Sequence, residues 1–168
     1  IDRSSLTAYF EHNNTHEKTS YSSDLLFGAD GAFAASRLNM QLSSDRFEYN
    51  QHYITAGYKE LIIPPGPNGE FLLEKNALHI WPRGRFMLIA LANEDGSFTC
   101  TLFMPHEGDK YAFDKLNSRE AVNTFFLDVF PDFYKMMPNV ADAWEDHPLS
   151  NLAIIRCYPW HKGKVALM

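Results

Sequence analysis

The chain has 168 residues, of which 45% are hydrophobic and 21% are charged, and its formal net charge is -6. This length and apolar share are sufficient for one core, so we expect one domain or a large part of one. An acidic balance without a block of Lys or Arg argues against a surface for nucleic acid or anionic membranes. Mild acidity is explained most simply by solubility.

The two cysteines, Cys100 and Cys157, lie far apart, and neither belongs to a CxxC unit, which excludes a zinc ribbon or a thioredoxin motif. We expect two reduced thiols that act as small core residues of a cytosolic protein. No apolar run reaches the roughly 18 residues that a membrane span needs. The chain starts at Ile1 and stops inside an apolar run, so we expect a fragment of a longer protein.

The first part of the chain predicts a hairpin followed by a helix. Residues 6–10 alternate like a strand, and the polar run 12–22 predicts a turn. Residues 24–31 predict a buried strand that ends in glycines and forms the second strand of the hairpin. Residues 32–42 favour a helix.

The loop at Asp30-Gly31 joins the predicted strand to this helix, which carries Arg37 in its middle. Such a loop can hold phosphates and riboses, because glycine lets the backbone approach a ligand and a helix start offers free N–H groups. The same pattern is more commonly only a turn, so both interpretations stay open.

The next segments predict extended structure. Residues 53–63 form a strand that stops at the Pro- and Gly-rich turn 64–69, and residues 71–74 and 77–81 are extended.

Two β-rich runs, residues 86–91 and 97–104, flank a short loop that contains Asp-Gly, which predicts an antiparallel hairpin. With Leu91 opposite Ser97, odd- and even-numbered residues lie on opposite faces. Both faces are apolar, whereas a hairpin with one solvated face would alternate with charges. We therefore expect one face to pack on helices and the other to cover something else. The odd-numbered face carries Met87, Ile89, Leu91, Thr99, Thr101 and Phe103.

The last part of the chain predicts helices and then strands. Residues 118–130 carry an apolar stripe at helical spacing, with Asn117 as N-cap and Glu120 as its capping-box partner. Pro131 ends this helix. Further predicted elements are short helices at 132–137 and 140–145 and strands at 152–158 and 165–168.

Patterns for catalysis or metal binding are weak. His12 and His16 have i, i+4 spacing but lie in a polar turn, so we expect no metal site there. His79 is interpreted as a strand histidine with satisfied hydrogen bonds. The sequence contains no GxSxG, GxGxxG or GxxxxGK[ST] motif. The residues by themselves therefore identify no catalytic acid, base or nucleophile.

Two strings resemble a known family. Residues 28–37, GADGAFAASR, resemble the Asp-Gly motif of FAD-dependent aromatic hydroxylases, with Ala34 where Ser is usual, so one polar contact is expected to be missing. Residues 77–84, ALHIWPRG, followed by the hairpin, resemble the kynurenine 3-monooxygenases more specifically, as does GYKEL at 57–61. The resemblance covers residues 24–168.

The resemblance implies an α+β fold, in which a mixed, largely antiparallel sheet backed by helices forms a substrate domain beside part of a Rossmann-like FAD domain. Residues 1–45 would belong to the FAD domain, residues 46–158 to the substrate domain, and residues 159–168 to a truncated strand returning to the FAD domain. The implied reaction is hydroxylation of L-kynurenine at ring carbon 3 by FAD, reduced by NADPH, and oxygen. The oxidative chemistry belongs to the cofactor, and the protein orients the ring and excludes water.

The resemblance also implies the site residues. Asp30, Gly31 and Arg37 would contact FAD, and no catalytic side chain is expected. Aliphatic side chains and one aromatic suit a ring, and a threonine hydroxyl adds one polar group, although ordinary sheet packing is the alternative for this face. The implied substrate-binding residues are Leu78, Met87, Ile89, Leu91, Thr101 and Phe103.

The segments that the family uses for the FAD adenosine half and for the substrate carboxylate are absent, so we expect the isolated chain neither to retain FAD tightly nor to turn over. We expect a cytoplasmic protein of bacterial type, with a small aromatic substrate and no nucleic-acid partner. Two alternatives stay open: a related flavin hydroxylase for another aromatic acid, and a stand-alone module that binds an aromatic ligand.

Overall fold

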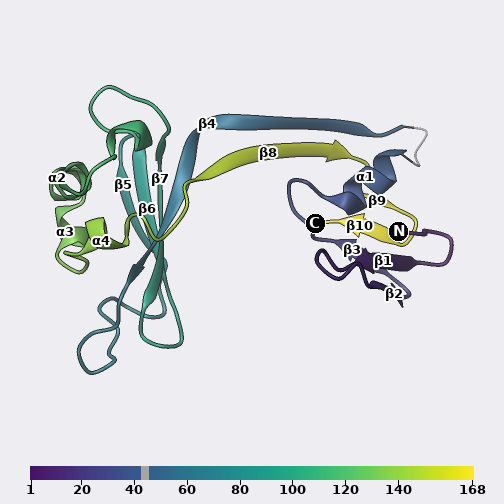
Figure 1. The fold of residues 1–168 in the computed structure, drawn as a ribbon, viewed down its shortest axis with the longest axis horizontal. Helices are drawn as coiled ribbons and strands as arrows, with labels where there is room; N and C mark the ends of the chain where they lie inside the picture. The colour runs from purple at the N-terminus through teal and green to yellow at the C-terminus, as the bar shows by residue number, and fades with distance from the viewer. Residues whose placement is uncertain (43–45) are drawn as a thin grey trace. The chain divides into compact units, whose positions relative to one another are not determined.

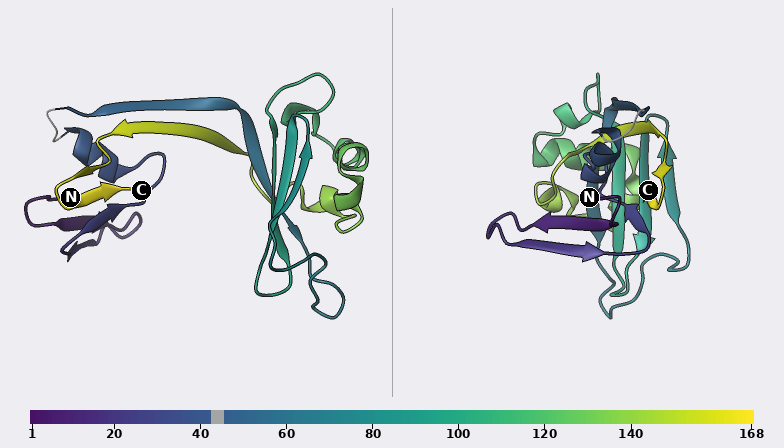
Figure 2. Two further views of the ribbon diagram at one scale, coloured as in Figure 1. Left: turned by 180° about the vertical axis from the view of Figure 1, so that it is seen from behind. Right: turned by 90° about the vertical axis from the view of Figure 1, so that its right-hand side faces the viewer.

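A computed structural model of the chain describes residues 1–42 and 46–168, which form two compact units. One unit comprises residues 1–52 together with 153–168, and the other comprises residues 53–152. Figures 1 and 2 show the elements of both units, coloured along the chain. Each unit combines strands and helix, so the predicted α+β class is confirmed.

The first hairpin lies earlier in the chain than predicted. Strand β1 (Thr7–Glu11) pairs antiparallel with β2 (Lys18–Ser22), so the second half of the predicted turn is a strand. The prediction was wrong because β2 is polar on both faces and fully exposed, and therefore lacks the alternation that marks a half-buried strand.

The predicted buried strand over residues 24–31 is only three residues long and does not join that hairpin. Strand β3 (Leu26–Gly28) pairs in parallel with β10 (Val165–Leu167), which pairs antiparallel with β9 (His161–Lys162). Phe27 is 57% exposed, so the strand is not buried throughout. The prediction was wrong because the pairing partner of β3 comes from the other end of the sequence.

Helix α1 (Ala35–Leu42) follows β3 after a loop and starts three residues later than predicted. It approaches the strand closely at Gly28, where an added Cβ would lie 2.2 Å from the Ser36 Oγ. A side chain at that position would displace the start of the helix, so glycine is required for the close approach.

A five-stranded sheet has the order β5-β6-β7-β4-β8 (Figure 1). Strands β5, β6 and β7 belong wholly to the second unit, whereas β4 and β8 have residues in both units. The pairings β5–β6, β6–β7 and β7–β4 are antiparallel. Residues 71–74, predicted to be extended, lie outside its strands. The strands are β4 (Glu48–Ile63), β5 (His79–Arg83), β6 (Phe86–Ala92), β7 (Phe98–Pro105) and β8 (Ser150–Tyr158).

The β6–β7 hairpin is confirmed, but its register differs by two residues from the prediction. Leu91 pairs with Thr99 rather than with Ser97. The turn is centred one residue later than assumed, because the Asn93 N–H donates to the Ser97 carbonyl at 2.8 Å and Gly96 takes a φ of 88°. This is a three-residue hairpin loop with glycine in the left-handed region. A shift of two preserves the faces, so the odd-numbered and even-numbered sets stay as predicted.

Three α-helices and one short 3-10 helix follow the hairpin. The serine before α2 is its N-cap, since its hydroxyl accepts a hydrogen bond from the Ala121 N–H at 3.2 Å. The predicted N-cap, Asn117, was wrong by one residue, which also moves Glu120 out of the capping-box position. Pro131 ends α2 as predicted and starts the next helix. The elements are η1 (Phe113–Lys115), α2 (Arg119–Val129), α3 (Pro131–Tyr134) and α4 (Val140–Ala143).

The core of the second unit lies between the helices and the even-numbered face of the hairpin, and Figure 1 shows α2, α3 and α4 on one side of the sheet. Buried aromatic rings fill it; for example, the rings of Phe125 and Phe126 lie 5.2 Å apart in an edge-to-face arrangement. The expectation that one face packs on helices is therefore confirmed. The fully buried members are Leu61, Ile63, Leu88, Ala90, Phe98, Cys100, Leu102, Phe125, Phe126, Phe130, Phe133 and Val140.

Within residues 1–42 and 46–168, no helix has the length and apolar character that crossing a bilayer requires.

Candidate functional site

The face of the second sheet that points away from the helices, here called the open face, is largely apolar. Directly paired residues of antiparallel strands point to the same side, so the register defines its rows. The central row reads Ile80, Ile89, Thr101 and Glu60 across four strands. The flanking rows are Pro82, Met87, Phe103 and Tyr58 on one side and Leu78, Leu91, Thr99 and Ile62 on the other.

All six residues implied for substrate binding lie on the open face. Leu78 precedes β5 by one residue and therefore points to the same side as Ile80. Leu78 and Leu91 are each 52% exposed and Met87 is 38% exposed, whereas the other three are half-buried. A contiguous exposed apolar surface of this kind is typical of an interaction or ligand-binding site.

Five members of the open face, Pro82 among them, were missed from the sequence. Ile80 is 51% exposed and Ile62 is 44% exposed, and the Tyr58 ring lies 6.1 Å from that of Phe103. The fifth, Glu60, is exposed and pairs with Thr101. For the members on β4, the sequence signal is the alternation along residues 57–63. Only the pairing of β4 with β7 shows that these residues lie on the open face.

The polar side chains of the open face differ in whether they already form hydrogen bonds within the protein. Thr99 exchanges hydrogen bonds with the Asn93 amide at 3.1 and 3.2 Å, so its hydroxyl serves the hairpin loop. Thr101 and Glu60 form no side-chain hydrogen bond or ion pair with any residue in 1–42 or 46–168. These two neighbouring groups are therefore available to a ligand.

In the first unit, the Asp-Gly loop is tied to the start of α1. The Asp30 carboxylate accepts hydrogen bonds from the Ser36 N–H at 2.9 Å and from the Ser36 hydroxyl. Burial acts to raise the pKa of the Asp30 carboxyl, but these hydrogen bonds outweigh it and the pKa falls below its ordinary value. Ser36 thus supplies a hydroxyl near the motif, although Ala34 stands where the family pattern has serine.

Gly31 and Arg37 complete the predicted cofactor set. Gly31 has a φ of 79°, and an added Cβ would meet nothing within 4 Å, so its backbone faces open space. Arg37 is only 8% exposed and donates to the Ala32 carbonyl at 2.8 Å. Its guanidinium also lies 4.4 Å from the centre of the Tyr49 ring, a contact that the sequence did not reveal. Arg37 therefore holds the loop that carries Gly31.

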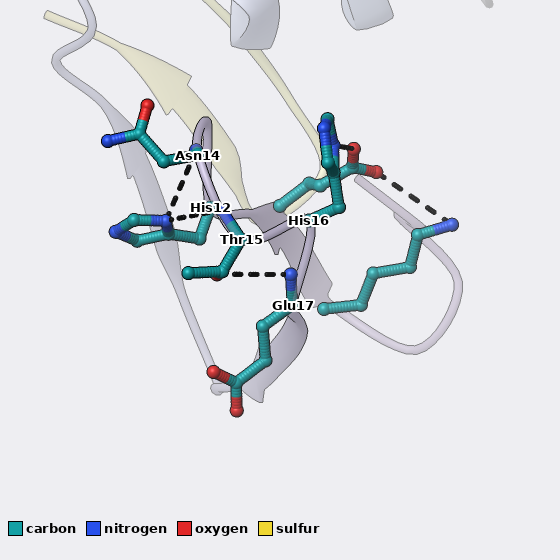
Figure 3. A network of polar contacts seen from close by, with 7 residues as sticks. His12, Asn14, Thr15, His16 and Glu17 are labelled. Carbon is teal, nitrogen blue, oxygen red and sulfur yellow. Dashed lines mark hydrogen bonds and ion pairs between the residues drawn. The ribbon is translucent and has the colours of Figure 1, made fainter.

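The side chains of His12, His16 and His79 contact residues that are near them in the sequence. Figure 3 shows the turn between β1 and β2, where the Nδ1 atom of His12 accepts from the N–H groups of Asn14 and Thr15 at 3.3 and 3.2 Å. His16 contacts the Glu11 carboxylate at 2.9 Å. Among the described residues, no group of three potential ligands is arranged for a metal. The Nε2 atom of His79 contacts the Glu74 carbonyl oxygen at 2.8 Å, as expected for a satisfied strand histidine.

Both cysteines are free thiols. Cys100 is fully buried on the even-numbered face, and burial raises its pKa to about 12. It is therefore a small core residue, as predicted, whereas Cys157 is only half-buried.

A buried lysine was also missed. Lys59 is 7% exposed and donates to the His147 carbonyl, with its Nζ atom 4.8 Å from the centre of the Trp144 ring. Burial lowers the pKa of Lys59, and the Glu145 carboxylate opposes that effect. Lys59 thus anchors the segment that leads into β8.

Two solved structures share the fold of this chain. One is 2-methyl-3-hydroxypyridine-5-carboxylic acid oxygenase, with a TM-score of 0.57 and 19% identity over 92% of this chain and 39% of that one. Another is HpxO of Klebsiella pneumoniae in complex with FAD, with a TM-score of 0.51 and 18% identity over 89% of this chain and 37% of that one. The chain therefore shares its fold with parts of these two proteins.

Sequence comparison shows which enzymes the chain resembles. The chain is 52% identical over 144 residues to the kynurenine 3-monooxygenase of Dictyostelium discoideum, which covers 85% of this chain and 31% of the relative. It is 49% identical over 153 residues to the kynurenine 3-monooxygenase of Flavobacterium psychrophilum, and the aligned region covers 90% of this chain and 34% of the relative. The resemblance to the kynurenine 3-monooxygenases is thus confirmed, and the chain spans about a third of their length. No family model matches the chain.

Proposed function

We propose that this chain contributes the substrate-contacting sheet and the Asp-Gly loop of an FAD-dependent monooxygenase that hydroxylates L-kynurenine at ring carbon 3. The observation that carries the proposal is the combination of 52% identity to a kynurenine 3-monooxygenase with an apolar sheet face left uncovered by the helices of its own unit.

The open face would bind the aromatic ring. Ile89 and Leu91 present aliphatic surface to a flat molecule, and Phe103 adds one aromatic ring at the edge of the same surface. Such a surface supplies dispersion contacts and removes water from around the ring. The side chains orient the substrate, and we assign none of them an acid, base or nucleophile role.

The Asp-Gly loop has the chemistry to contact FAD. The Asp30 carboxylate is exposed and ionised at neutral pH, and each of its oxygens keeps a lone pair after accepting from Ser36, which suits a ribose hydroxyl. Open space beside Gly31 lets a ligand approach the backbone, while Arg37 holds the loop from within. When bound and reduced, FAD would supply the activation of oxygen.

NADPH is the proposed reductant, and a cytoplasmic location is proposed for the whole protein. The isolated 168 residues are expected to be purified without stoichiometric FAD, because they carry no GxGxxG segment. A yellow preparation with one flavin per chain would contradict this expectation.

The test of the proposed function compares substrates of the full-length protein. NADPH oxidation and product formation are measured with L-kynurenine and with hydroxybenzoates at equal concentrations. We expect stimulation of NADPH oxidation by L-kynurenine, together with a product hydroxylated at ring carbon 3. Hydroxylation of a benzoate but not of kynurenine would refute the proposal in favour of a related flavin hydroxylase.

A further inference from the structure

One charged residue interrupts the open face. Glu60 stands in the central row beside Thr101, and the other members of its three rows are uncharged. Its carboxylate is exposed and forms no hydrogen bond or ion pair with another described residue. A carboxylate at this place contributes nothing to the packing of the sheet, because the core lies on the opposite face.

Covering the open face with a ligand has a specific consequence for Glu60. The ligand removes water from the carboxylate, and a desolvated charge without a partner is strongly unfavourable. A ligand that carries a cation offsets this loss, since a charge-assisted hydrogen bond is about twice as strong as a neutral one. A ligand whose only charge is a carboxylate adds repulsion. The surface therefore favours an aromatic molecule that also carries an ammonium group.

We propose that Glu60 is a specificity-determining residue that accepts the ammonium group of an aromatic amino-acid substrate bound to the open face. The proposal rests on the proposed function and specifies how the site would distinguish an aromatic amino acid from an aromatic acid. Thr101 supports it with a hydroxyl that is free to accept or donate next to the same group.

The spacing fits one amino acid lying across the strands. Neighbouring strands are about 4.8 Å apart, so Glu60 stands one strand from Thr101 and two strands, roughly 10 Å, from Ile89. A ring over Ile89 would direct the other end of the substrate across β7 toward β4. The flexible side chain of Glu60 then needs to span only the remaining distance between the backbone of β4 and the ammonium group of the substrate.

The experiment compares two ligands and four forms of the full-length protein. The ligands are L-kynurenine and the analogue in which hydrogen replaces its α-ammonium group. The proteins are the wild type, Glu60→Gln, Glu60→Asp and Glu94→Gln. Gln keeps the shape of the side chain and removes its charge, and Asp keeps the charge. Glu94 lies in the β6–β7 loop, exposed and outside the three rows, so it is a charge-matched control.

We expect the wild type to bind kynurenine more tightly than the analogue. Glu60→Gln should reduce this preference about 10- to 100-fold in Kd and in kcat/KM, with the change mainly in KM, and the analogue should be nearly unaffected. Glu60→Asp should retain part of the preference, and Glu94→Gln should retain all of it.

Equal losses for both ligands in Glu60→Gln, or no loss, would overturn the role of Glu60, as would a wild type without a preference for the ammonium form. Flavin content and thermal unfolding, compared with the wild type, identify a variant that is merely misfolded, in which case the Kd ratio of Glu60→Asp decides. If the wild type prefers kynurenine but does not hydroxylate it, the proposed function fails while Glu60 is still judged by the Kd ratios.

Discussion

Replacing Ile89 with serine in the full-length protein should weaken the use of kynurenine. Ile89 lies in the central row of the open face between Ile80 and Thr101 and is half-buried, so its exposed part remains for the substrate to cover. Covering apolar surface of this size contributes about 1–3 kcal/mol, which corresponds to roughly 5- to 150-fold in kcat/KM. The loss should appear mainly as a higher KM, because the ring makes this contact before and during the reaction.

The assay is steady-state product formation with kynurenine, accompanied by thermal unfolding. The matched control is Leu127→Ser, because Leu127 is 51% exposed on α2, which packs against the opposite side of the sheet. Unchanged kinetics in Ile89→Ser, or an equal loss in Leu127→Ser, would refute the assignment of the open face to the substrate.

Three further predictions concern stability and titration. Phe126→Ala should lower the free energy of unfolding by about 3–5 kcal/mol, because its fully buried ring packs among other aromatic rings; chemical denaturation measures this, and an unchanged midpoint would contradict it. Cys100 should resist alkylation at pH 8 in the folded protein and react after unfolding, since it is buried and its pKa is about 12; labelling of Cys100 itself in the native protein, located by peptide mass spectrometry, would show this account to be wrong. Ser36→Ala should raise the pKa of Asp30 toward its ordinary value, as followed by carbon-13 NMR of the carboxyl. Because the folded-state pKa of Asp30 is lowered, its stabilising contacts are present at neutral pH and disappear as the pH falls through that pKa, so Ser36→Ala should have a shallower acid-induced loss of stability; identical titrations would argue against the contact.

The sequence was most informative where the structure depends on local pattern. The two faces of the β6–β7 hairpin follow from residue parity, and parity survived a register error of two residues. The helix before Pro131 follows from spacing, although its N-cap moved by one residue to Ser118. Such features depend on neighbours within a few residues.

Features that depend on distant pairing were missed. The parallel partner of β3 is β10, from the opposite end of the chain, so residues 24–31 alone predicted the wrong hairpin. Glu60 joins the open face only through the pairing of β4 with β7, some forty residues along the chain. The contact of Arg37 with Tyr49 likewise requires the fold, because no local pattern links a helix residue to that strand.

The most direct measurement of the central claim is a crystal structure of the full-length protein with L-kynurenine bound. We predict that the ring lies in van der Waals contact with the side chains of Ile89 and Leu91 on the open face. Finding that face filled by the protein's own helices, with kynurenine bound elsewhere, would contradict it.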